Sequence, residues 1–328
     1  MLRTMYLPAQ GALRTGLEPI DIAFALQDPH GLFWVDFEGM APEECQPMLL
    51  NTFGFHPLAV DDALEESHFP KLDDWGKYLY IVLHTPRSTP ENRLETLELD
   101  IFLGDNFIVT HHDAPIEAVQ KVWSSIERDP RYLRGGPDHV LYRLADETAS
   151  ATMLAVELLD DETDAIEAEV FERPRPILVE RIFAIKRSML HLRRIIAPQR
   201  EVLNKLARDE FQMIDEKDRI YFRDVYDHYV RLYEIIESVR DLVSGTLDTY
   251  LSVTNNRMND IMKTLTLITT FFMPISFVAG FFGMNFFATP DPLTEWMTRP
   301  MFVLAGVLMV AMPTAMYFWM RRMGWMQR

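Results

Sequence analysis

An asparagine amide stands at the end of a long uncharged segment. Residues 264–282 contain no charged side chain, and Gly283, Met284 and Asn285 follow directly. An amide offers a hydrogen-bond acceptor and two donors, so Asn285 can bind polar groups that the apolar residues before it cannot. A polar side chain at the end of a segment long enough to cross a membrane indicates a functional site.

A second polar feature runs along the same segment. Seven residues at heptad spacing carry small, amide, hydroxyl or thioether side chains, whereas the residues between them are mostly Leu, Ile, Phe and Val. We call these seven the polar stripe: Asn259, Met262, Thr266, Thr269, Met273, Ser276 and Gly280. Their spacing places them on one face of a helix. The pattern fits a face that lines a path around a symmetry axis, and it fits equally a tight helix contact with no pore.

A metal enzyme is a competing interpretation, because His111, His112 and Asp113 are adjacent in the sequence. Neighbouring residues of a strand point to opposite faces, so the two histidines form a poor chelate, and no matching carboxylate–histidine motif occurs elsewhere. The chain also lacks a glycine-rich phosphate loop, which disfavours an ATP-driven pump. We expect neither an enzyme nor an organic cofactor.

Acidic side chains dominate the first 260 residues. Of 49 acidic and 32 basic residues, 47 and 27 lie before position 261, so this part carries a formal charge of −20. Such a charge repels nucleic acid and concentrates cations, although acidity also serves solubility alone. We expect no nucleic-acid partner.

Two uncharged segments predict two transmembrane helices. Residues 264–282 and 301–320 are each close to the ~20 residues that cross a bilayer as a helix. Aromatic residues at their ends favour membrane spans over a buried hairpin. Basic residues precede the first span and follow the second: Arg257, Lys263, Arg321, Arg322 and Arg328. Because positive residues favour the cytoplasmic side, both termini are expected in the cytoplasm, in a multi-pass protein of the cell (inner) membrane.

Prolines inside the spans predict an oligomer. Pro274 and Pro313 leave helix carbonyls without their usual partners, which neighbouring helices or water must satisfy, and two spans offer few neighbours. Cys45 is the only cysteine, which agrees with a reducing compartment for the soluble part. The N-terminal residues show no secretory signal pattern, so residues 1–260 are expected in the cytosol.

The soluble part is predicted to be an α/β (α+β) domain followed by long helices. Strand-like runs occupy residues 31–37 and 77–86, and residues 94–112 read as two strands around a turn at Gly104. Residues 41–53 and 116–129 are helical in pattern. Three long helices follow, over residues 139–172, 177–209 with a kink at Pro198, and 215–282. We therefore expect six parts: the cytosolic α/β domain 1–136, the long cytosolic helices 137–214, the stalk helix that continues into the first span 215–282, the outer loop 283–300, the second span 301–320 and the basic tail 321–328.

Residues 250–286, with a short loop and one more span after them, resemble the CorA family of Mg²⁺ and Co²⁺ channels. The resemblance rests on the Gly-Met-Asn signature, on "MKTLT" (262–266) and "MPISFVAG" (273–280) before it, and on "YFRDVYDH" (221–228). It is strong over about residues 215–320. The resemblance implies a homopentamer shaped as a funnel, with five first spans around one pore in the lipid bilayer.

The same resemblance assigns roles along the first span. Gly283, Met284 and Asn285 form the outer selectivity ring. The residues that line or constrict the pore are Asn259, Met262, Leu265, Met273 and Ser276, joined by Gly280 from the polar stripe. In one helical turn the two arguments choose different pore-facing residues: the family resemblance indicates Leu265, whereas the heptad spacing indicates Thr266. Mg²⁺ gives up its water reluctantly, so five amide oxygens suit the hydrated ion.

The resemblance also implies regulation by Mg²⁺ held between cytosolic domains. Asp224 matches an acidic residue of that regulatory site, and Asp227 lies one turn along. The family also has a partner carboxylate in the N-terminal domain, expected here soon after residues 78–84. The only candidate that this sequence offers there is Glu91. In the outer loop, Asp291 and Glu295 would attract cations. Two alternatives remain: a ZntB-type zinc transporter, against which Met284 argues, and a membrane-anchored ion sensor that does not conduct.

Overall fold

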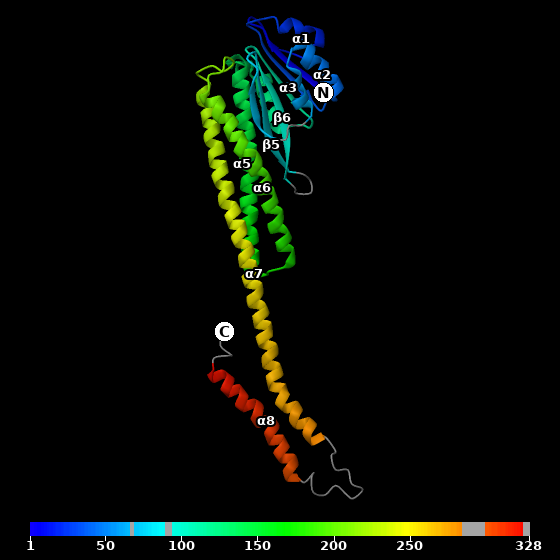
Figure 1. Ribbon diagram of the computed structural model, residues 1–328, viewed down its shortest axis with the longest axis vertical. Helices are drawn as coiled ribbons and strands as arrows, with labels where there is room; N and C mark the ends of the chain where they lie inside the picture. Colours follow the sequence, from blue (N-terminus) through cyan, green and yellow to red (C-terminus); the bar gives the residue numbers. More distant parts are fainter. Residues whose placement is uncertain (66–68, 89–93, 284–298, 324–328) are drawn as a thin grey trace. The chain divides into compact units, whose positions relative to one another are not determined.

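A computed structural model of the chain describes residues 1–65, 69–88, 94–283 and 299–323 (Figure 1). It contains two compact units, Met1–Asp248 and Thr249–Arg328. Four residues of the predicted sites, Met284, Asn285, Asp291 and Glu295, lie outside the described residues, as does Glu91.

The first unit is built on a mixed sheet of seven strands in the order β2-β1-β3-β7-β6-β5-β4. β3 runs parallel to β7, and every other neighbouring pair is antiparallel. The strands are β1 (Leu2–Leu7), β2 (Arg14–Thr15), β3 (Leu32–Glu38), β4 (Lys71–Asp74), β5 (Leu79–Ser88), β6 (Leu94–Leu103) and β7 (Phe107–His112). The predicted hairpin around Gly104 is confirmed as β6 and β7.

Helices cover both faces of the sheet because the strands are apolar on both sides. In β5, Leu79 and Ile81 pack with α4 (Glu117–Arg128) and α5 (Pro137–Glu172), whereas Tyr80 and Val82 pack into a second core. The second core contains residues of α1 (Pro19–Ala25), α2 (Pro42–Pro47), the π-helical turn η1 (Met48–Thr52) and α3 (Pro57–Leu64). The predicted α/β class is therefore confirmed, as a three-layer arrangement.

The sequence patterns missed the edges of this sheet. They predicted four strands, and the structure adds β1, β2 and β4 as well as helices α1 and α3. β2 has two residues, and β4 (Lys71–Asp74) is charged at three of its four positions, so neither shows the apolar alternation by which strands are detected. A charged edge strand is a common protection against pairing with another chain.

Long helices make up the rest of the chain. α6 spans Pro176–Arg208 and includes Pro198 without ending there, and α7 spans Arg219–Gly283. A 3₁₀ segment, η2 (Pro130–Gly135), precedes α5. The third long helix was predicted from residue 215, but residues 215–218 form a turn closed by the Asp218 N–H and the Asp215 carbonyl (3.0 Å).

α7 changes its surroundings along its length. In the first unit its residues Phe222, Val225, Tyr229 and Leu232 are buried at helical spacing in the core shared with α5 and α6. Figure 1 shows the three helices side by side there. Beyond Thr246 most of its side chains are exposed in the single chain. The second unit holds this exposed part of α7 and α8 (Arg299–Arg322).

Candidate functional site

The polar stripe lies on the exposed part of α7. All of its members are exposed in the single chain, and so is Leu265. Most apolar residues between them are exposed or half-buried: Phe277 retains 71% of its accessible surface, whereas Val278 is buried. Within the most apolar window of α7 only 6% is buried. The described residues of one chain leave most of this helix uncovered, so lipid or other copies of the chain must cover it.

Threonine hydroxyls on the stripe are turned into the helix. Thr266 Oγ1 donates to the Met262 carbonyl (2.8 Å) and Thr269 Oγ1 donates to the Leu265 carbonyl (2.9 Å). Because each hydroxyl proton is used within the helix, the oxygen keeps only acceptor capacity toward its surroundings. Acceptors without donors suit the water molecules around a cation, which point their hydrogens outward.

The glycines of the same region have no packing reason within one chain. Gly283 is the last residue of α7, and no described atom other than its own helix neighbours lies within 4 Å of a Cβ built at Gly280 or Gly283. Among the described residues, no contact therefore requires glycine at position 280. At Gly283 a requirement for glycine can come from the backbone, since glycine lets a chain leave a helix easily.

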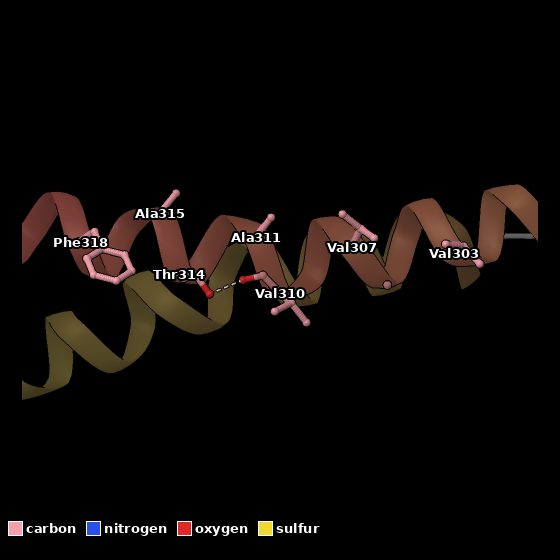
Figure 2. A pocket seen from close by; sticks show the side chains of 8 residues that line it. Val303, Val307, Val310, Ala311, Thr314, Ala315 and Phe318 are labelled. Atoms are coloured by element: carbon pink, nitrogen blue, oxygen red, sulfur yellow. Dashed lines mark hydrogen bonds between the residues drawn. The ribbon is translucent and has the colours of Figure 1, made fainter.

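α8 presents an apolar face with a shallow hollow of about 700 Å³ (Figure 2). The labelled side chains are Val303, Val307, Val310, Ala311, Thr314, Ala315 and Phe318. Thr314 is the polar member, and its hydroxyl donates to the Val310 carbonyl (2.6 Å), so it offers no free proton. Both α7 and α8 are long and apolar enough to cross a membrane.

The two carboxylates of the predicted regulatory site lie on one exposed face of α7. Asp224 keeps 68% of its side-chain surface and lies 3.9 Å from His228 Nε2, and Asp227 is also exposed. Residues three apart share a helix face, so both can reach one ion. Carboxylate oxygens are the kind of ligand that a hard cation prefers.

The structure adds a carboxylate that the sequence patterns did not single out. Burial raises the pKa of Tyr142 on α5, and the charges of Asp146 and Asp224 raise it further. The charges of Asp146 and Asp224, 78 positions apart, therefore both act on the same phenol. Asp146 is one of many acidic residues along α5, and only the packing of α5 against α7 distinguishes it from the others.

His111 and His112 do not share a site. His111 Nδ1 lies 3.6 Å from Asp100 Oδ2 on β6, whereas His112 Nε2 lies 3.1 Å from Asp36 Oδ1 on β3. Both histidines are buried. Each is thus engaged with a strand on a different side of β7, which agrees with the expectation of a poor chelate.

Among the described residues, Asp36, Glu38 and His112 are close enough to hold a metal ion, but a side chain already fills this position. The Arg3 guanidinium binds Asp36 Oδ2 through Nε (3.0 Å) and Nη2, and Nη2 lies 3.5 Å from Glu38 Oε2. Thr110 Oγ1 also donates to Asp36 Oδ1 (2.5 Å). This network stabilises the sheet rather than binding an ion.

Replacing Asp36 with alanine is expected to lower the free energy of unfolding by ~3–5 kcal/mol, because Arg3 and His112 would lose their buried partner. Burial by itself would raise the pKa of Asp36, but His112, Thr110 and Arg3 hold it below 3.8. The stabilisation is thus present above pH ~4 and is lost as the pH falls through the lower, folded pKa. Denaturant unfolding of the detergent-solubilised chain at pH 7 and below pH 4 measures both effects.

The exposed Asp61→Ala on α3 is the matched control for Asp36→Ala and should change stability by less than ~0.5 kcal/mol. Equal unfolding midpoints for the two variants at pH 7 would contradict the role given to the Asp36 network.

The chain is similar in sequence to known metal ion transporters. A family model described as CorA-like Mg²⁺ transporter protein matches residues 29–322. The chain is 35% identical over 310 residues to a "Putative metal ion transporter YfjQ" of Bacillus subtilis, covering 94% of each chain. It is also 35% identical to a "Cobalt/magnesium transport protein CorA" of Thermotoga maritima, covering 85% of this chain and 80% of the relative.

Solved structures agree with the fold. The complete structure of the CorA magnesium transporter from Methanocaldococcus jannaschii matches with a TM-score of 0.79 at 22% identity, covering 98% of each chain. More distant relatives are named for another ion: a "Zinc transport protein ZntB" of Yersinia pseudotuberculosis is 22% identical over 89% of this chain and 88% of its own. The relatives therefore share an architecture and differ in the ion after which they are named.

Proposed function

The chain belongs to the family of CorA-like Mg²⁺ transporter proteins, which are transporters of divalent cations and not enzymes, and from this membership we propose that it conducts chiefly Mg²⁺ into the cytoplasm. Co²⁺, and by similar chemistry Ni²⁺, would follow the same path. The observation that carries this proposal is the polar stripe of α7, a line of hydrogen-bond acceptors and small side chains on a helix that one chain leaves uncovered.

Five copies of α7 around one axis would form the pore. Such a ring would cover the polar stripe by symmetry and turn the apolar remainder of α7 toward α8 and lipid, and the exposure of most of this helix in the single chain supports it. Met262, Leu265 and Met273 would form apolar rings that stop a hydrated ion when they close, because water leaves a narrow apolar ring. Asn259, Ser276 and Gly280 would leave room between these rings.

At the outer end, Gly283, Met284 and Asn285 would form the selectivity ring. Five Asn285 amide oxygens can accept hydrogen bonds from the water around Mg²⁺ without removing that water, which costs much energy for this ion. Neutral amides would also release the ion more readily than five carboxylates would. Asp291 and Glu295 in the same loop would raise the local cation concentration.

Regulation is proposed to act through Mg²⁺ held by Asp224 and Asp227. The protein is proposed to lie in the cell (inner) membrane with both termini in the cytoplasm. The acidic first 260 residues support a cytosolic part that needs cations to lower its own repulsion. When cytosolic Mg²⁺ falls, loss of the bound ion would free the packed helices and open the pore. The exposed Asp224 and the nearby Asp146 support an ion at this place.

Flux through proteoliposomes tests the proposed function. We expect Mg²⁺ uptake, measured with a fluorescent indicator, that Co²⁺ and Ni²⁺ inhibit more strongly than Zn²⁺ does. We also expect Co²⁺ uptake to slow when the vesicles are prepared with millimolar Mg²⁺ on the side of the soluble domain. Zn²⁺ uptake without Mg²⁺ uptake would support the alternative of a zinc transporter, which the similarity to ZntB proteins motivates. No uptake of any of these cations by correctly assembled protein would support a non-conducting sensor.

A further inference from the structure

Three aspartates meet where α5 and α7 begin, at the same end of the helical bundle (Figure 1). Asp138 lies in the first turn of α5, and Asp215 and Asp218 lie in the turn that leads into α7. One carboxylate oxygen of each lies within 4.8 Å of those of the other two. Oxygens that share one Mg²⁺ or Ca²⁺ are separated by at most ~4–5 Å, since metal–oxygen distances are ~2.0–2.6 Å.

Asp218 is the member that ordinary structural roles do not explain. Its side chain keeps only 3% of its surface, and its Oδ2 accepts no hydrogen bond from any residue that the structure describes. Its other oxygen lies 3.4 Å from His139 Nδ1. A buried carboxylate oxygen without a hydrogen bond is costly, so it is usually paired with a cation or a donor.

Asp138 is held in place by backbone groups. Its Oδ1 accepts from the His139 N–H (3.0 Å) and its Oδ2 accepts from the Asp215 N–H (3.0 Å), which ties the turn before α7 to α5. Burial raises the pKa of Asp138, and the charges of Asp218 and Asp215 raise it further, against the opposing effect of the Asp215 N–H. The three groups therefore repel one another as the structure stands.

The positive charge beside the cluster is a flexible surface lysine. Lys217 Nζ lies 2.7 Å from Asp215 Oδ2 and 3.8 Å from Asp218 Oδ2, and 65% of its side chain is exposed. One ammonium group balances one of three carboxylates, and an ion pair between two exposed side chains, such as Lys217 and Asp215, contributes little to stability. The exposed Asp215, with 63% of its side-chain surface accessible, leaves the cluster open to ions from solvent.

We propose that Asp138, Asp215 and Asp218 bind a hard divalent cation that ties the start of α7 to the start of α5 within one chain. The cation replaces the Lys217 ammonium, which lies 3.8 Å from Asp218 Oδ2, and binds this oxygen directly, although no hydrogen bond from the described residues reaches it. Oxygen ligands and a net negative charge suit Mg²⁺, Mn²⁺ or Ca²⁺ rather than a metal that prefers sulfur or several nitrogens. This site involves neither Asp224 nor Asp227, and it does not depend on whether the chain conducts ions.

Binding of Mn²⁺ to the purified full chain in detergent tests the proposal, with free Mn²⁺ measured by electron paramagnetic resonance. Asp218→Asn keeps the shape of the side chain and should remove one bound Mn²⁺ per chain relative to the wild type. Glu216→Gln removes the same charge from the same turn, outside the cluster, and should bind as many ions as the wild type. Equal Mn²⁺ stoichiometry for the wild type and Asp218→Asn would overturn the proposal.

A second variant decides the matter even if Asp218→Asn does not fold. Lys217→Gln keeps all three carboxylates and removes the competing ammonium, so Mn²⁺ should bind the cluster several-fold more tightly. Added Mg²⁺ should then raise the melting temperature of Lys217→Gln at least as much as that of the wild type. If Lys217 is instead the permanent counter-ion, Lys217→Gln will lower the melting temperature and leave Mn²⁺ affinity unchanged, which would overturn the proposal.

Discussion

Asn285→Ala is expected to reduce Mg²⁺ uptake by at least ~100-fold while the oligomer still assembles. The substitution removes five amide acceptors from the proposed ring at once, and each hydrogen bond to a charged or strongly polarised partner contributes of order 1 kcal/mol or more. Methyl groups would leave the water shell of Mg²⁺ without partners at the pore mouth. Uptake into proteoliposomes measures the loss, and size-exclusion chromatography in detergent measures assembly.

Asn256→Ala is the matched control, because it removes an amide from α7 at an exposed position outside the polar stripe. It should retain uptake within about two-fold of the wild type, as surface substitutions usually have small effects. Near-normal uptake by assembled Asn285→Ala would rule out the amide ring. A similar loss in both variants would show that the assay reports a general effect of removing an amide side chain from this part of the sequence.

Thr269→Leu should lower Mg²⁺ uptake by ~10-fold or more, whereas Thr270→Leu should change it by less than ~2-fold, because only Thr269 belongs to the polar stripe. Consecutive residues of a helix point ~100° apart, so the pair compares two faces at one depth with the same chemical change. Leucine at position 269 would replace a hydroxyl oxygen, which now keeps acceptor capacity, by a larger apolar group. An apolar ring at that depth favours expulsion of water from the pore.

The same assay and assembly test apply to both threonine variants. Equal uptake by Thr269→Leu and Thr270→Leu would mean that the polar stripe does not face the ion path, and the interpretation as a plain helix contact would then gain support. A stronger loss for Thr270→Leu would place the axis on the neighbouring face of α7. Each outcome therefore assigns a face of the helix without reference to the outer ring.

Local patterns were sufficient for the elements that depend on one segment alone. The uncharged runs at 264–282 and 301–320 indicated the two helices that are long and apolar enough to cross a membrane. The turn at Gly104 indicated the β6–β7 hairpin, and the absence of helix breakers indicated α5, α6 and α7 to within a few residues. The family resemblance rested on the Gly-Met-Asn motif at residues 283–285 together with the segments 221–228, 262–266 and 273–280, which are also local patterns.

Contacts between distant segments needed the tertiary structure. The Arg3 guanidinium binds Asp36 and lies near Glu38, so it occupies the position where Asp36, Glu38 and His112 could otherwise hold a metal ion. Asp138 meets Asp215 and Asp218 although 77 residues separate the first two. Hydrophobic periodicity reports how one segment repeats, and it contains no information on which turns of two helices meet or which strands are neighbours. Those choices follow from packing and register, and they decided which of the many acidic residues of this chain lie close enough to share one ion.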